Sequence, residues 1–390
     1  MAGRLLALDG LRGTLALYVL AGHTLPFLAL PPRLGGLRPA FSHGHAAVAL
    51  FFMLSGLVIL GSVERALSQP QPITRFLLAR AGRLLPVYGA ALALAVVALS
   101  LGNPFTAMPW LPTGSAARDM MESAWPADWP LHLAGHALLL QGLLPPALLP
   151  DATFSILGPA WSLSTEWQFY ALEALAMAAL GERATDPWAL PAWVIVLLLL
   201  GVIGLASADL PSSWQCGRGF LPKESWFFAL GIASFALQRQ PTAASARILM
   251  AVTLVAACVM SGIETKPAAA LAPLVWLLCF ACQSPASTPP FARSAVALGY
   301  RLLTAPVLLW TGRISYPLYL SHAPMQRLLM LWLAPRAEGD WHRFTWSFAG
   351  PAIALPLLVA LILHHGLEKP LRLRLSLYAS ASNTSAAGPL

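Results

Sequence analysis

Long apolar stretches without alternation limit this chain to the few folds that a lipid bilayer permits. Residues 189–206 and 347–363 are two of these stretches, each close to the roughly 20 residues that a helix needs to cross a membrane. Within hydrocarbon every backbone amide must be hydrogen-bonded inside the protein, so only helices or a closed barrel are possible. Barrel strands alternate in polarity, and these stretches do not. The sequence therefore predicts an all-α, polytopic membrane protein.

The scarcity of charge excludes a soluble protein. Only 10% of the 390 residues are charged, against about a quarter in a soluble domain, so membrane lipids must surround the chain. The net charge is +8, but the basic residues are scattered and do not favour a nucleic-acid partner. Cys279 and Cys282 form a C-x-x-C inside an apolar run, where core residues are expected. We expect no metal and no tightly bound cofactor.

Eleven apolar segments are visible, of which one is ambiguous. They lie near residues 11–30, 46–63, 84–102, 132–149, 159–180, 189–207, 225–237, 246–263, 268–283, 314–334 and 345–365. In a topology in which segment 132–149 does not cross the membrane, most lysine and arginine residues lie on the cytoplasmic side, as the positive-inside rule requires. In a topology in which it does cross, they do not. We therefore expect about ten transmembrane helices plus one re-entrant or interfacial segment, with both termini cytoplasmic. Residues 1–378 would form the membrane domain, and the Ser- and Ala-rich tail 379–390 would be disordered.

The first segment contains ionisable residues that are costly inside a membrane. It includes Asp9, Arg12 and His23. Arg12 and His23 are eleven residues apart, about three helical turns, so they share a face roughly 16 Å apart. Gly10 and Gly13 would allow a neighbouring helix to approach closely. This spacing fits a functional pair of residues. It fits equally a structural role, in which the arginine snorkels to the interface and the histidine is hydrogen-bonded in the core.

Two further groups of polar residues are candidates for a site. Arg80 and Arg83 lie on one helical face beside the membrane, where guanidinium groups suit phosphate recognition, although arginines at this position also anchor topology. Glu166 shares a face with Tyr170 at helical spacing, and its carboxylate needs a polar cavity or a partner such as an arginine. His322 lies within a late apolar helix.

These residues fall in ordered blocks that resemble a known family. The blocks are LDGLRG with a histidine eleven residues after its arginine (Arg-x10-His), FFMLSGLVI (51–59), RAGR (80–83), WSLSTEWQFY (161–170), GRISYPLYLSH (312–322) and LEKP (367–370). Together they are similar to the motifs of membrane-bound acyltransferase family three, the bacterial O-acyltransferases of polysaccharide, lipopolysaccharide and peptidoglycan. Ala49 and Trp167 stand where relatives often carry acidic residues.

The resemblance implies a reaction and a location. An acyl group, expected to be acetyl, would pass from the co-substrate acyl-CoA (acetyl-CoA) to a hydroxyl of a carbohydrate or glycolipid acceptor. The enzyme would lie in the inner (plasma) membrane. Arg80 and Arg83 would bind the CoA phosphates on the cytoplasmic side, with Arg12 nearer the thioester.

The resemblance also implies roles in the chemistry. His23 would remove the proton of the acceptor hydroxyl or relay the acyl group as a nucleophile. Glu166 would orient His23 or bind acceptor hydroxyls, and His322 is a second candidate for either task. A transporter with a polar path remains an alternative, although it would predict broken helices in matched halves, which are absent from the sequence pattern. A non-enzymatic scaffold is the other alternative.

Overall fold

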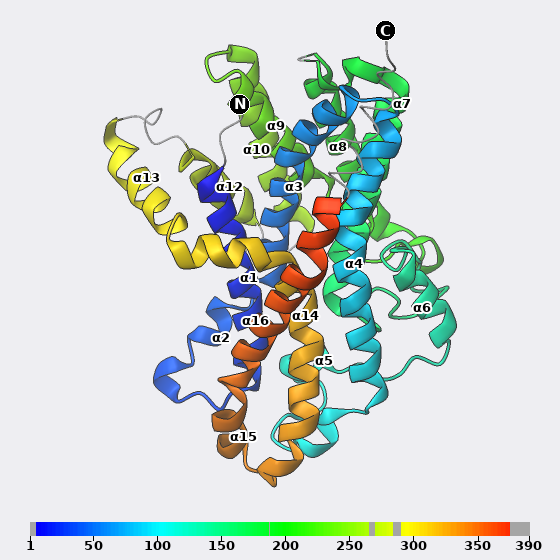
Figure 1. Cartoon of the computed structure of the whole chain (residues 1–390), viewed down its shortest axis with the longest axis vertical. Coiled ribbons are helices and arrows are strands. Elements are labelled where there is room, and N and C mark those ends of the chain that lie inside the picture. Colours follow the sequence, from blue (N-terminus) through cyan, green and yellow to red (C-terminus); the bar gives the residue numbers. More distant parts are fainter. Residues whose placement is uncertain (1–4, 187, 265–269, 284–289, 375–390) are drawn as a thin grey trace.

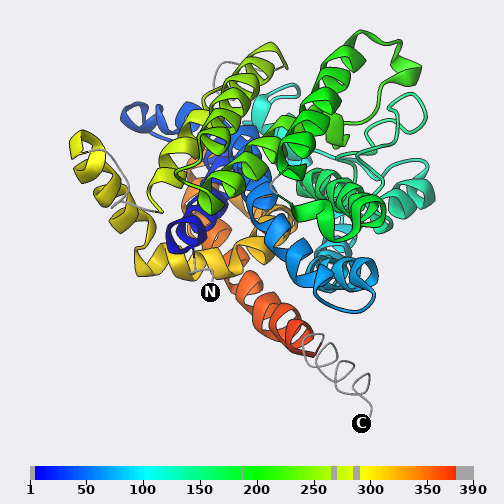
Figure 2. The same cartoon turned by 90° about the horizontal axis from the view of Figure 1, so that it is seen from above.

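The computed structural model describes residues 5–186, 188–264, 270–283 and 290–374, and the regular elements in these ranges are all helices (Figure 1). This confirms the predicted all-α class. The predicted disordered tail, 379–390, lies outside the described residues. Seen from above, the helices form an irregular bundle, and the segment from α16 to residue 374 points away from it (Figure 2).

Apart from α13, which lies between two of the predicted segments, the longer helices overlap the apolar segments of the sequence. They are α1 (Leu6–Thr24), α3 (Gly44–Leu67), α4 (Pro72–Ser100), α7 (Trp161–Leu180), α8 (Ala189–Ala206), α9 (Ser225–Arg239), α10 (Ala244–Glu264), α12 (Ala272–Ala281), α13 (Pro290–Leu303), α14 (Pro306–Leu333) and α16 (Pro351–Leu363). The shorter helices are α2 (Leu37–Ala40), α5 (Ala116–Met121), α6 (Trp129–Ala137) and α15 (Trp341–Phe348).

The number of membrane-spanning helices is smaller by length and composition than the ten predicted. In the described ranges, five helical segments are long and apolar enough to cross a membrane, and the bent pair α13–α14 would make six. The protein is therefore a multi-pass membrane protein, while the count of ten is not confirmed. Two helices fall short by length, because α9 has 15 residues and α12 has 10, against about 20 for a full span.

The ambiguous segment 132–149 does not cross the membrane as one helix, which confirms the prediction from charge. Its helical part, α6, has nine residues, or roughly 13 Å of rise, and turns follow it as far as Leu157. His132 and His136 are buried in this segment. The α6 helix contacts α4 through the bond from Tyr88 to the His136 carbonyl, and α5 contacts α14 through the bond from Arg327 to the Met121 carbonyl (Figure 1). We refer to residues 103–158 as the cap.

Glycines let α1 and α14 pack backbone against backbone, as the sequence predicted for α1. A Cβ atom on Gly13 would lie 2.1 Å from the carbonyl oxygen of Leu308, and one on Gly312 would lie 2.1 Å from that of Asp9. Contacts this short exclude any side chain larger than hydrogen. The close approach brings the polar residues of the two helices to one interface, and this interface positions the site.

Candidate active site

Two cavities meet at one wall in the centre of the bundle. The larger has a volume of about 890 Å³ and the smaller of about 120 Å³; we refer to them as the large cavity and the small pocket. Val48 and Tyr319 line both of them. The candidate residues from the sequence divide between the two, with the histidines in the large cavity and the arginines in the small pocket.

The large cavity brings together the two histidines that the sequence singled out separately. His23 lies in the last turn of α1 and His322 in the middle of α14. Their ring centroids are 4.8 Å apart with an angle of 79° between the planes, the edge-to-face arrangement that aromatic rings prefer. Spacing along the chain could not predict this contact, because it joins opposite ends of the sequence.

The hydrogen bonds of this pair leave ring nitrogens available for chemistry. Nδ1 of His322 lies 3.3 Å from the carbonyl oxygen of Leu318. Since a carbonyl only accepts, Nδ1 carries the proton of the neutral ring and Nε2 holds a lone pair. Nε2 of His322 and Nδ1 of His23 are both buried without a hydrogen-bond partner. Buried polar atoms are rarely left unpaired unless a ligand, water or function requires it.

The small pocket collects three arginines from two helices. Arg12 of α1 and Arg80 and Arg83 of α4 line it together with the carboxylates of Asp9 and Glu166. Three guanidinium groups outnumber two carboxylates, so the pocket favours an anionic group, and the planar forks suit phosphate oxygens in particular. The sequence predicted each of these arginines as a candidate, and the structure places them in one pocket.

Glu166 lies in the small pocket and not against His23, which corrects the expectation that it orients His23. Its Oε1 accepts a hydrogen bond of 2.9 Å from the hydroxyl of Ser55 and another from the hydroxyl of Tyr170. The shared face of Glu166 and Tyr170 was predicted correctly. That face, however, points into the small pocket. The carboxylate therefore lies among the guanidinium groups of Arg12, Arg80 and Arg83.

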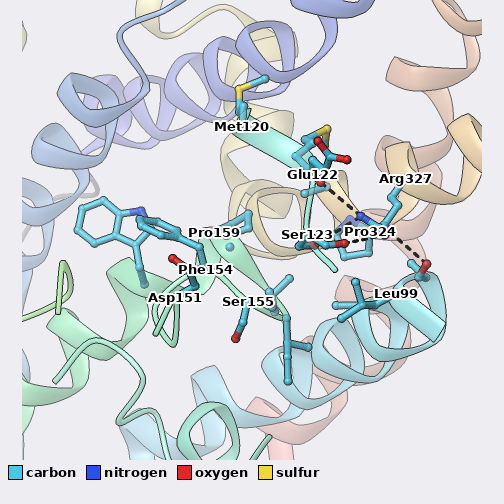
Figure 3. A pocket seen from close by; sticks show the side chains of 18 of the residues that line it. Leu99, Met120, Glu122, Ser123, Asp151, Phe154, Ser155, Pro159, Pro324 and Arg327 are labelled. Carbon is cyan, nitrogen blue, oxygen red and sulfur yellow. Dashed lines mark hydrogen bonds between the residues drawn. The ribbon is translucent and has the colours of Figure 1, made fainter. Parts of the chain in front are cut away.

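Arg327 joins the cap to the helix that carries His322. Its guanidinium group donates to the backbone carbonyls of Ala98 at 3.2 Å, Gly102 at 2.8 Å, Met121 at 3.3 Å and Ser123 at 3.1 Å, and its Nη1 lies 3.4 Å from the Ser123 hydroxyl. Figure 3 shows this side chain at the wall of the large cavity, between Ser123 and the end of α4 near Leu99. No role was predicted for Arg327 from the sequence.

A second polar contact orders the same part of the cap. Glu122 accepts hydrogen bonds from Arg118, one of 2.8 Å through Nη2, and one of 2.9 Å from Asn103. The bond from Arg118 holds the pKa of the Glu122 carboxyl below its usual range. Glu122 lines the large cavity (Figure 3), so this contact fixes part of the cavity wall.

His45 and Arg218, which line the large cavity, belong to a charged cluster that was not predicted from the sequence. Glu224 is completely buried, and it accepts a hydrogen bond of 2.9 Å from His45 Nε2 and pairs with Arg218 at 3.3 Å. The guanidinium of Arg218 also lies 5.5 Å from the ring centre of Trp161. The sequence feature that could have revealed this cluster is Glu224, an acidic residue directly before the apolar helix α9.

No group of three or more His, Cys, Asp or Glu side chains in the described ranges is arranged to hold a metal ion. The site is instead a pair of adjoining cavities in a helical membrane protein, one basic and one bearing imidazole groups with free lone pairs.

Comparison with known proteins identifies the class of enzyme. A family model described as an acyltransferase domain matches residues 5–365, nearly the whole chain. The chain therefore belongs to acyltransferase family three, and it is an acyltransferase. It is also 30% identical over 206 residues to "Protein 2 in picA locus" of Rhizobium radiobacter, a match that covers 53% of this chain and 95% of the relative. No solved structure matches the chain.

Proposed function

We propose that this acyltransferase moves an acetyl group from acetyl-CoA, on the cytoplasmic side of the inner membrane, to a hydroxyl of a cell-surface or lipid-linked carbohydrate. The observation that carries the proposal is the pair of adjoining cavities. A basic pocket suits a donor rich in phosphate, and a large cavity with a free imidazole suits an acceptor hydroxyl. The two share a wall, as a direct transfer requires.

The donor half rests on the charge of the small pocket. Arg80 lies in it with only 6% of its surface exposed, and a buried guanidinium is stabilised by an anionic partner. Coenzyme A supplies phosphates, which planar guanidinium forks bind in a bidentate manner. With the termini on the cytoplasmic side, Arg80 and Arg83 near the start of α4 and Arg12 near the start of α1 meet a donor that is made in the cytoplasm.

The acceptor half rests on the size and lining of the large cavity. Its volume of about 890 Å³ is at the upper end of the range for ligand sites. The lining includes Asp119, Asp128 and Asp151, together with the rings of Trp125 and Phe154. Carboxylates accept hydrogen bonds from hydroxyl groups, and aromatic faces cover apolar surface. This combination suits a polyhydroxylated acceptor such as a sugar.

The chemistry follows from the histidine pair. His23, the less buried of the two, removes the proton from the acceptor hydroxyl. The hydroxyl oxygen then bonds to the thioester carbonyl carbon, the carbon–sulfur bond breaks, and CoA leaves as a thiolate that takes up the proton. His322 packs against the ring of His23 and positions it. A base in this position contributes about two to four orders of magnitude in rate.

The proposal is tested in cells and with the purified protein. Mass spectrometry of surface and lipid-linked glycans should find O-acetyl groups in cells that carry the gene and lose them when the gene is deleted. A copy with His23→Ala should fail to restore them. The protein in lipid vesicles should transfer label from acetyl-CoA to those glycans. Identical glycan acetylation with and without the gene would contradict the carbohydrate acceptor.

A further inference from the structure

Tyr319 forms the wall between the two cavities, and the proposed chemistry gives it no task. We propose that Tyr319 is a partition that shields the donor thioester from water in the large cavity, so that the acyl group reaches the acceptor and is not lost to hydrolysis. This inference rests on the proposed function, because it requires an acyl donor in the small pocket. It makes Tyr319 a residue that determines the choice between acceptor and water.

The position of the ring supports a partition. Tyr319 and Val48 line both cavities and are each less than a tenth exposed. The Tyr319 ring centroid lies 6.1 Å from that of Phe51, which lines the small pocket, and 6.1 Å from that of His322, which lines the large cavity. The ring therefore stands between a residue of the donor side and a residue of the histidine pair.

The hydroxyl of Tyr319 is held at the same boundary. It donates a hydrogen bond of 3.0 Å to the carbonyl oxygen of Pro159 and lies 3.1 Å from the hydroxyl of Ser162. Pro159 lines the large cavity (Figure 3), and Ser162 lines the small pocket. A movement of the ring away from the boundary breaks both contacts. The two contacts therefore hold the ring across the passage in this closed position, and transfer to an acceptor in the large cavity requires the ring to move aside.

The proposed chemistry needs such a barrier. A histidine that removes a proton from an acceptor hydroxyl removes one from water equally well. Water would then attack the thioester carbonyl, the carbon–sulfur bond would break, and the products would be acetate and free CoA. The base itself does not distinguish water from the acceptor. Enzymes prevent such side reactions by excluding water from the reacting group, and here the residue placed to do so is Tyr319.

The experiment measures free CoA thiol released from acetyl-CoA by the full-length protein in lipid vesicles, with and without glycan acceptor. We expect the wild-type protein to release little CoA until acceptor is added. Tyr319→Ala should raise the release without acceptor at least about tenfold, by admitting water to the thioester. The ratio of acyl transfer to hydrolysis should fall accordingly. A partition, unlike a general structural role, changes this ratio and not only the overall activity.

Two further variants keep the test decisive if Tyr319→Ala does not fold. Val48→Ala opens the wall from α3 and leaves the Tyr319 hydrogen bonds intact, so it should raise hydrolysis by a smaller factor. Tyr319→Phe keeps the ring and loses the hydroxyl contacts, so it should fall between the wild type and the alanine variant. Tyr88→Ala is the matched control, because Tyr88 is also buried, donates a 2.6 Å hydrogen bond to the carbonyl of His136, and lines neither cavity.

The outcomes separate this inference from the proposed function. If the wild type transfers acetyl groups but no Tyr319 or Val48 variant hydrolyses acetyl-CoA faster, only the partition is wrong. If Tyr88→Ala raises hydrolysis as much as Tyr319→Ala, the effect is general loosening and the partition is again wrong. If the wild type transfers no acetyl group from acetyl-CoA to any glycan, the proposed function fails, and the partition fails with it.

Discussion

The contact between His23 and His322 predicts that the two residues act as one catalytic unit. We consider three variants, His23→Ala, His322→Ala and the double variant. Loss of a positioned base should lower the turnover number for acyl transfer by at least about a hundredfold, which corresponds to roughly 2.7 kcal/mol of transition-state stabilisation. Because the rings touch, with centroids 4.8 Å apart, removing either one disables the pair.

The double variant tests most directly whether the two histidines act together. If the two histidines acted independently, the losses of the single variants would multiply to about ten-thousandfold in the double variant. If they act together, the double variant should lose about as much activity as one single variant. We expect the second result. His23→Ala should change folding little, since Nδ1 of His23 has no hydrogen-bond partner to leave unpaired, whereas His322→Ala also removes the bond from Nδ1 to the Leu318 carbonyl oxygen. The KM for acetyl-CoA should also stay near the wild-type value, because the donor contacts lie in the small pocket.

The assay is transfer of labelled acetyl groups by purified protein in lipid vesicles, with thermal melting of each variant in parallel. His342→Ala is a suitable control, since His342 lies on α15 and lines neither cavity. Its activity should equal that of the wild type. A double variant whose loss is the product of the two single losses would refute the pairing. A His23→Ala protein with substantial activity would refute the chemistry.

Three further outcomes are expected. Replacing Arg80 and Arg83 with Ala should raise the KM for acetyl-CoA, and Lys replacements should restore it only partly because a point charge lacks the fork; an unchanged KM would leave the pair as a topology anchor. The depressed pKa of Glu122 contributes stability above about pH 4.3, the ordinary pKa of a glutamate, and that stability is lost as the pH falls through the folded pKa. The wild type should therefore melt higher than Glu122→Gln at pH 7, with the gap closing as the pH falls below the lowered pKa of Glu122. A gap that persists in strong acid would exclude the Arg118 contact as its source. A reporter fused to the C-terminus should read as cytoplasmic, and a periplasmic reading would contradict the topology.

Composition and spacing predicted the helical membrane fold, because long apolar runs leave few alternatives. Charge counting also predicted that segment 132–149 does not span. The candidate residues Arg12, Arg80, Arg83 and His23 were found from their cost inside a membrane and from the motif blocks. Each of these signals is local, so it identifies a residue without its tertiary neighbours.

The errors and omissions lie where tertiary packing decides. Helical spacing placed Glu166 on a polar face but could not say which neighbour that face meets, and the partner is Ser55, on a different helix. Tyr319 looked like one more aromatic residue in a late helix until the structure placed it in the walls of two cavities. The cluster around Glu224 joins residues from separate loops and helices, which no periodic pattern reveals.

The anchoring of the cap by Arg327 has a consequence for how this enzyme can diversify. Its guanidinium reaches the cap through the main-chain carbonyl oxygens of Met121 and Ser123, and reaches the chain just before the cap through those of Ala98 and Gly102. Every amino acid supplies such oxygens. Mutations in the cap can therefore alter the side chains that line the large cavity while the attachment to α14 persists. Substitutions in the cap can thus change the lining of the large cavity, where we propose that the acceptor binds. They leave α14, the helix that holds His322, unchanged.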